Sequence, residues 1–249
     1  VWIMAYTTID DPTIYFNTVL YTGNGSTQSV TGFGHAPNLI WAKERNNAKD
    51  HAWYDSVRGA NQLLESNKTG AESTTSAGIS SFDSDGFTTG DFFQTNDNGD
   101  TYVSWGWRAG GTASSNSDGS ITSSVSANTT AGFSICAWTG NSGTIGHGLG
   151  VKPDMIIIKS RQTSNNWVVL HNSLTGGMDT NGIVLNDTAA ETSGGSGMAE
   201  PTSSVFTITS GLAANDNNIG YVFAGKQGYS KFGKYTGNGN AEGPFVYTG

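Results

Sequence analysis

One five-residue phrase occurs three times in this chain. It reads Tyr-Thr-Gly-Asn-Gly at residues 21–25, Trp-Thr-Gly-Asn-Ser at residues 138–142 and Tyr-Thr-Gly-Asn-Gly again at residues 235–239. A phrase that returns at long intervals is the signature of a duplicated structural unit. An aromatic residue followed by Thr, Gly and Asn is also typical of a strand that leads into a tight turn. The phrase therefore predicts tandem units, each headed by a strand and a turn.

Other shared segments support the duplication. The segment that begins at Pro37 (PNLIWAKER) has a counterpart that begins at Pro153 (PDMIIIKSR), 116 residues later. Two further anchors, Asn-Asp-Asn at residues 96–98 and 215–217 and Tyr-Val at residues 102–103 and 221–222, are 119 residues apart. The change in spacing predicts a loop insertion of three residues. We expect a lead-in segment over 1–19, a first β repeat over 20–112, a linker plus second β repeat over 113–231, and the start of a truncated third repeat over 232–249. We also expect this last segment to complete a sheet of a neighbouring unit or subunit.

Composition and local pattern favour strands over helices. Gly accounts for 35 of 249 residues, about twice its usual share, and Gly, Ser, Thr and Asn are poor helix formers. The apolar runs at residues 39–42 and 155–158 follow a Pro and precede Lys-x-Arg. This pattern predicts strands that are buried on both faces and emerge into solvent at the Lys. Asp-Ser-Asp-Gly at residues 83–86 predicts a hairpin turn. The expected fold is all-β, with two tandem β-sandwich-like repeats of the jelly-roll or concanavalin kind and little helix.

Charge and cysteine content exclude several classes of partner and bond. The net charge of −8 and the absence of any basic run disfavour nucleic acid as a partner. The single Cys136 cannot form an internal disulfide. No stretch approaches the roughly 18 apolar residues of a membrane helix, so we expect no membrane insertion. The first residue is not Met and the sequence ends abruptly in Val-Tyr-Thr-Gly at residues 246–249, so we expect a portion of a longer protein.

Longer phrases resemble a known family. They are HAWYDSVRG at residues 51–59, SITSSVSANTTAGF at 120–133, GHGLG at 146–150 and GYSKFG at 228–233. These phrases resemble recurrent text in tail fibre and other tail proteins of bacteriophages that infect cyanobacteria and other marine bacteria. The resemblance spans essentially the whole chain. It implies a non-enzymatic virion structural protein, an extracellular tail-fibre component on the virion surface that contacts other virion proteins and host surface polysaccharide. By analogy with fibres it implies a homo-oligomer, for which we expect a trimer.

Two alternatives to the tail fibre stay open: a capsid-decorating surface protein without a receptor role, and a secreted carbohydrate-binding adhesin module. An enzyme is disfavoured. None of the four histidines lies in a metal-ligand spacing, no nucleophile elbow or phosphate loop occurs, and the Glu residues lie mostly in polar loops. No cofactor is expected.

Aromatic residues are the candidates for glycan binding. Trp105 and Trp107 lie on one face of a predicted strand, with Arg108 on the other. Sugar rings stack on such indoles while Asn and Asp bind the hydroxyls. The competing interpretation is that these indoles fill a sandwich core, because Trp is highly buried on average. The full set of candidates is Trp53, Tyr54, Trp105, Trp107 and Trp167.

One acidic loop raises the question of calcium. Asp97 and Asp100 lie in Asn-Asp-Asn-Gly-Asp, and alternating carboxylates are hard oxygen ligands that suit Ca²⁺. The loop does not complete an EF-hand, which requires a Glu at its twelfth position. Asp, Asn and Gly also favour tight turns, and turn formation explains the loop more simply than a metal does.

Overall fold

The structure is a computed structural model that describes residues 7–193 and 198–247. Within these residues the only helix is the short 3₁₀ turn η1 (Pro12–Ile14), and the remaining regular elements are strands. No helix in the described part of the chain is long and apolar enough to cross a membrane. The prediction of an all-β, β-sandwich-like fold with little helix is confirmed.

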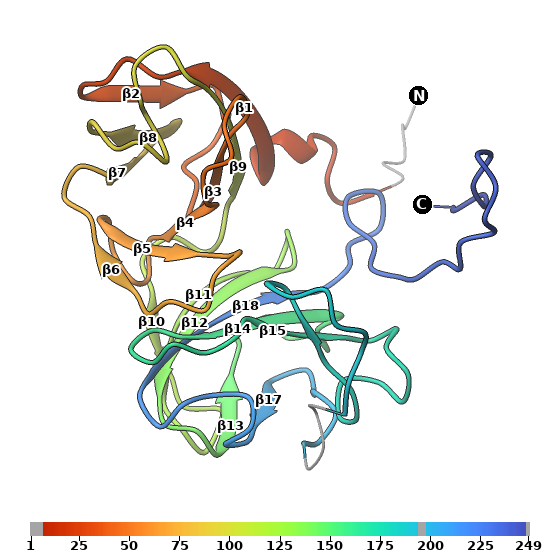
Figure 1. Cartoon of the computed structure of the whole chain (residues 1–249). Coiled ribbons are helices and arrows are strands. Elements are labelled where there is room, and N and C mark those ends of the chain that lie inside the picture. The colour runs from red at the N-terminus through yellow and green to blue at the C-terminus, as the bar shows by residue number, and fades with distance from the viewer. Residues whose placement is uncertain (1–6, 194–197, 248–249) are drawn as a thin grey trace, which may run out of the picture.

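The first unit contains two antiparallel sheets and lies at the top of Figure 1. The larger sheet has the order β1 (Phe16–Thr22), β9 (Thr101–Trp107), β3 (Leu39–Glu44), β4 (Ala52–Asp55), β5 (Gln62–Glu65) and β6 (Ser73–Thr74). The smaller sheet has the order β2 (Gln28–Thr31), β8 (Gly86–Thr89) and β7 (Ile79–Asp83). The predicted hairpin at residues 83–86 is present, because Asp83 pairs with Gly86 where β7 turns into β8.

The second unit has the same plan and lies at the bottom of Figure 1. Its larger sheet has the order β10 (Ser114–Asn116), β11 (Ser123–Asn128), β12 (Phe133–Thr139), β18 (Asn217–Phe223), β14 (Met155–Ser160), β15 (Val168–His171) and β16 (Ile183–Val184). Its smaller sheet pairs β13 (Gly143–Gly146) with β17 (Val205–Ile208). Strands β12-β18-β14-β15-β16 repeat the order β1-β9-β3-β4-β5.

Strand register corrects one part of the sequence alignment. Leu39 pairs with Trp107 in the first unit, and Met155 pairs with Phe223 in the second. The spacing between the units is therefore still 116 residues at this strand, and the predicted three-residue insertion before it is wrong. The shared Asn-Asp-Asn and Tyr-Val phrases occupy different positions in the two units. Thr101 corresponds to Asn217, because the two residues accept equivalent hydrogen bonds. The Thr101 carbonyl accepts the N–H of Arg45, which follows β3, and the Asn217 carbonyl accepts the N–H of Arg161, which follows β14.

The four sheets stack as layers around three apolar cores. One core lies between the two sheets of the first unit and contains Phe33, Ile40 and Phe87. Another lies between the two sheets of the second unit and contains Trp138, Ile158 and Phe206. The third core lies between the two larger sheets, where the units meet. The larger sheets are therefore buried on both faces over much of their area, as the apolar runs at 39–42 and 155–158 predict.

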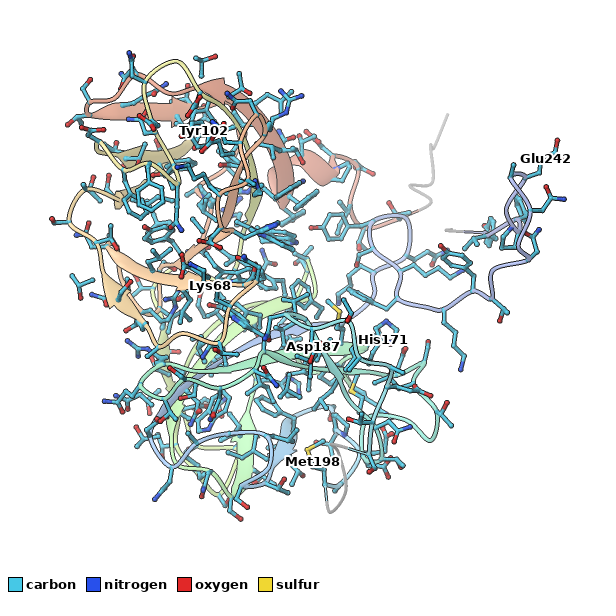
Figure 2. All side chains as sticks on the ribbon, viewed as in Figure 1. Lys68, Tyr102, His171, Asp187, Met198 and Glu242 are labelled. Carbon is cyan, nitrogen blue, oxygen red and sulfur yellow. The ribbon has the colours of Figure 1, made fainter. Side chains whose placement is uncertain are left out.

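One expectation about a strand end is wrong, and one about the last segment is not met within this chain. Lys159 does not emerge into solvent at the end of its strand but is fully buried. Residues 232–247, which contain the third phrase, form no strand in the described structure and complete no sheet of this chain. This segment projects from the body of the molecule at the right of Figure 1. Glu242 marks it in Figure 2.

Candidate functional site between the two units

The candidate site lies where the inner faces of the two larger sheets meet. Alternation along β9 turns Trp105 and Trp107 toward the second unit, whereas Tyr102, Ser104 and Gly106 face the core of the first unit. Trp41 lies beside this pair on β3, with its ring centroid 5.5 Å from that of Trp105. The prediction that the two indoles share one strand face agrees with this geometry.

An apolar cavity of about 200 Å³ opens beside these indoles. Both units and the segment that follows β18 contribute to its walls. Its aromatic lining consists of Trp41, Trp53, Trp107, Phe133, Phe223, Tyr229 and Phe232. The ring of Trp53 lies 5.0 Å from that of Tyr221 and 5.2 Å from that of Trp167. The cavity accepts a flat apolar surface, because aromatic faces line it and few polar atoms do.

Burial corrects three of the five predicted glycan residues. Trp53 is 1% exposed, and Tyr54 and Trp167 are 0% exposed. A sugar requires an open ring face for stacking, so these three side chains cannot form a binding surface in the folded chain. Tyr54 packs inside the first unit, whereas Trp53 and Trp167 pack in the core between the units. Only Trp105 and Trp107 are half-buried and retain exposed area.

A buried ionic network joins the two units beside this core. Arg58 pairs with Asp55 and, at 3.1 Å, with Glu72 of the same unit. Arg161 of the second unit binds Glu72 in a bidentate manner, at 2.9 and 2.7 Å. The Tyr221 hydroxyl donates to Asp55 Oδ2 at 2.7 Å. Each charge therefore has a partner of opposite sign, which offsets the cost of removing it from water.

Burial and charge shift the pKa values of this network. Burial raises the pKa of Tyr221 well above its ordinary value, so its hydroxyl stays protonated and donates to Asp55. The nearby carboxylates of Asp55 and Glu72 outweigh the effect of burial and raise the pKa of Arg58. Both side chains therefore keep one protonation state over the physiological pH range, and the network acts as a fixed structural link.

Further hydrogen bonds cross between the units, two of them from side chains outside this network. The indole N–H of Trp167 donates to the carbonyl of Glu65 at 3.0 Å. Lys159 Nζ donates to the carbonyl of Thr69 at 3.2 Å. Burial lowers the pKa of Lys159 to about 8. Lys68, labelled in Figure 2, lies at the level where the units meet.

The predicted calcium residues form a turn. Both carboxylate oxygens of Asp100 accept amide N–H groups, from Asn46 at 2.8 Å and from Asn47 at 3.2 Å. Asp97 Oδ1 accepts the backbone N–H of Asn98 at 2.9 Å. No group of three or more His, Cys, Asp or Glu side chains is placed to hold a metal ion within residues 7–193 and 198–247. Asp97 therefore stabilises its own turn, and Asp100 links this turn to the loop that contains Asn46 and Asn47.

A larger hollow of about 340 Å³ lies in the second unit, away from the aromatic residues. Its neutral lining is part polar, from Asn165, Asn166, Thr192 and Ser210, and part apolar, from Val168, Ile183, Val184, Leu212 and Ala213. None of the residues that the sequence singled out lies in it. The cavity between the units is the stronger candidate site, because it brings predicted residues from distant parts of the chain together.

Several residues of the site escaped sequence analysis. Trp41 sits inside an apolar run and reads as ordinary core. Glu72 and Arg161 lie 89 residues apart and meet only because the two sheets face each other. Asp55 and Arg58 lie within the HAWYDSVRG phrase, and a carboxylate and a guanidinium three residues apart in an apolar context were a usable signal of a buried ion pair.

The comparison with family profiles accounts for nearly the whole chain. A profile described as a domain of unknown function, DUF7483, matches residues 11–249. The chain belongs to the DUF7483 family. The match spans both sandwich units, the core between them and the segment after β18, so the DUF7483 domain includes the duplicated pair of units. Searches of curated proteins and of solved structures found no match.

Proposed function

We propose that this chain is a non-enzymatic structural component of a bacteriophage virion, exposed on the tail as part of a fibre. The observation that carries the proposal is the continuous core between the units, crossed by the Arg58–Glu72–Arg161 network. Such a junction resists bending, because relative motion of the units would expose apolar surface and separate buried charges. A rigid pair of sandwiches suits a mechanical role, and the phrases that resemble phage tail proteins supply the virion context.

The proposed activity is adhesion to glycans of the host surface. Trp107 lines the cavity, and Trp105 packs against Trp41 of its lining; both indoles are half-buried. Trp41 Nε1 donates to His51 Nδ1 at 2.9 Å, which places a polar imidazole beside the indoles. A sugar ring presents apolar C–H groups on one face and hydroxyls around its edge, and this combination of indoles and polar groups fits both.

Location on assembled particles tests the structural part of the proposal. Virions are purified from a phage whose genome encodes the chain. Their proteins are identified by mass spectrometry, and the chain is located by immunogold labelling with an antibody against the folded chain. We expect the chain among the virion proteins and the label on the tail. Label confined to the capsid supports the decorating alternative, and absence from the particle together with release into the medium supports a secreted adhesin.

Glycan binding is tested separately with isolated protein. The wild-type chain and Trp105→Ala are compared on an array of bacterial surface polysaccharides. The matched control is Phe93→Ala, which removes another exposed ring, 45% exposed, away from the cavity. We expect Trp105→Ala to bind at least about tenfold more weakly, a loss of ~1.4 kcal/mol, and the control to bind normally. If the wild-type chain binds no glycan on the array, or if both variants bind equally well, these indoles do not bind host glycans.

A further inference from the structure

The outer edge of β1 is uncovered, whereas the equivalent edge in the second unit is paired. Strand β1 ends the six-stranded sheet, and no strand of residues 7–193 and 198–247 pairs with its outer side. In the second unit the equivalent strand β12 is covered by β11, where Ser124 pairs with Ala137. Ala137 is the counterpart of Leu20, because Phe16 and Phe133 hold the same position opposite Trp107 and Phe223. The fold therefore has a place for one more strand beside β1.

The hydrogen-bonding pattern shows which backbone groups of β1 face outward. The N–H of Arg108 donates to the carbonyl of Tyr15 at 2.8 Å, and the N–H of Gly23 donates to that of Asp100 at 2.8 Å. Successive residues of an antiparallel strand bond to opposite sides, so the odd-numbered residues between these two bond to β9. The even-numbered residues, Thr18 and Leu20 among them, direct their N–H and C=O groups outward. Asn17 Oδ1 accepts the Thr18 N–H at 2.8 Å, and Gln28 Nε2 donates to the carbonyl of the last strand residue at 3.1 Å.

Of the sheet ends in residues 7–193 and 198–247, this edge is the longest, and β2, β13 and β17 have four residues each. Strand β6 has two residues, β10 three and β16 two, so those ends offer little length for pairing. Strand β7 carries Asp83 and a register shift. In contrast, β1 has seven residues, FNTVLYT, with no charge and no Pro, and its Leu20 is 61% exposed. A long, uncharged edge with an exposed apolar side chain pairs readily with another strand.

We propose that β1 pairs antiparallel with β1 of a second copy of the chain, about a two-fold axis at Val19. This register overlaps all seven residues. It places Thr18 opposite Leu20 of the partner, and Phe16 opposite Thr22 of the partner. The outward-facing groups then meet as hydrogen-bonded pairs, which replace the side-chain caps from Asn17 and Gln28. Because a two-fold contact uses the same patch on both copies, the pairing is closed and leaves no second β1 edge open.

The sequence of β1 fits a second copy better than a charged partner. Each residue of FNTVLYT meets a neutral residue in this register, so no charge is buried or repelled despite the net charge of −8. Leu20 lies on the same sheet face as Trp105, since Thr18 pairs with Trp105 two residues earlier. Pairing therefore covers the exposed Leu20 and continues the six-stranded sheet into that of the partner.

A disulfide test reads the register directly. Val19 faces Val19 of the partner in a non-hydrogen-bonded pair, whose Cα atoms lie about 4.5 Å apart, within the roughly 4.4–6.8 Å that a disulfide spans. Val19→Cys is oxidised mildly and run on a non-reducing gel. Leu20→Cys is the matched control, because it faces Thr18 of the partner and not itself. The native Cys136 is buried and does not compete. We expect about tenfold more linked dimer from Val19→Cys than from Leu20→Cys.

Mass measurement completes the test. Light scattering after size-exclusion chromatography of the wild-type chain, at a concentration on the order of 100 μM, should give twice the chain mass of 26.0 kDa. Leu20→Lys, checked for folding by circular dichroism, should give a monomer because it introduces two buried like charges. A wild-type monomer, a trimer, or equal linking of the two cysteine variants overturns the pairing. None of these outcomes alters the localisation test, so the virion proposal stands or falls separately.

Discussion

The two units share a topology and differ in what covers them, as one pair of equivalent lysines shows. Lys43 Nζ donates to the carbonyls of Glu44 and Asn47, and Lys159 Nζ donates to those of Ser160 and Thr163. Each ammonium thus stabilises the loop after the same strand. Lys159 is nevertheless fully buried and Lys43 is not, because the Thr69 carbonyl of the first unit also covers Lys159. The environment of a residue in this fold depends on the neighbouring unit as much as on its own strand.

A second pair of equivalent positions shows specialisation for the junction. Asp55 and His171 each lie opposite the first residue of the preceding strand, Leu39 and Met155. Asp55 is fully buried in the network between the units, whereas His171 is only half-buried. The first unit therefore supplies the carboxylates of the junction, and the second unit supplies Arg161 and Tyr221.

The largest effect is expected from Arg58→Met. The substitution leaves Asp55 buried without its cation and removes one partner of Glu72. Removing one member of a buried pair costs about 3–5 kcal/mol of the free energy of unfolding. Urea denaturation followed by tryptophan fluorescence measures the loss. Lys68→Met is the control, because the side chain of Lys68 is 46% exposed and its ion pairs contribute at most about 1 kcal/mol. Equal losses in the two variants contradict a buried network.

The next largest effect on the free energy of unfolding is expected from the titration of Lys159. Its pKa of about 8 in the folded chain lies below the ordinary value of 10.5. The unfolded chain therefore binds more protons between these values, and the free energy of unfolding rises with pH across this window. The full rise is about 3 kcal/mol at most, since one pKa unit corresponds to ~1.4 kcal/mol. Urea denaturation at several pH values between 7.5 and 9.5 measures part of this rise in the free energy of unfolding, below the pH at which tyrosines titrate. Lys159→Met should abolish this rise, and Lys43→Met should retain it.

Local pattern made several strands of both units predictable, whereas register and contacts between units depend on distant residues. The apolar runs and the Asp-Gly turn identify β3, β14 and the β7–β8 hairpin. The phrase marks strand ends for a steric reason, because a Cβ on Gly23 would lie 2.1 Å from the Asp97 carbonyl oxygen. The repeated Asn-Asp-Asn misleads, since Asp100 and not Asp97 is the counterpart of Asp216. The carbonyls of Asp100 and Asp216 accept the N–H of the phrase's Gly in each unit.

The candidate site was predictable only in part. Alternation correctly grouped Trp105 with Trp107 on one face of β9. Alternation does not reveal what packs on that face. Side chains alternate every two residues both on a face open to solvent and on a face covered by another sheet. For this reason the sequence leaves two interpretations of Trp53 and Trp167, a glycan platform and, on average burial, a place in the core. Their burial arises from packing of β4 against the second unit, which no local pattern encodes.

A smaller effect is expected at another pair of equivalent positions, His51 and Trp167. Trp167→Phe removes the indole N–H that bonds the Glu65 carbonyl across the junction. The Glu65 carbonyl keeps the N–H of Lys68 at 3.1 Å, so the lost hydrogen bond costs about 0.5–1.5 kcal/mol, and the volume that the smaller ring leaves unfilled in the core adds to the loss. His51→Phe removes the acceptor of the Trp41 indole N–H at a half-buried position, where water can replace it, and should cost less than ~1 kcal/mol. Urea denaturation of both variants compares them. A larger loss of stability in His51→Phe than in Trp167→Phe would mean that contact across the junction does not determine how much each residue contributes to stability.

The smallest effect on the free energy of unfolding is expected from protonation of His147 of the second unit at acid pH. Its ring is fully buried, Nδ1 accepts the Leu149 N–H at 3.2 Å, and Nε2 lies 3.3 Å from the Thr202 carbonyl. Burial lowers its pKa from the ordinary 6.5. The unfolded chain thus protonates first as pH falls below 6.5, and stability is lost in that direction because a proton on Nδ1 displaces the Leu149 bond. His147→Gln should flatten the decline between pH 7 and 5 measured by urea denaturation. An unchanged decline would assign the acid sensitivity to the other three histidines, each of which burial also shifts downward in pKa.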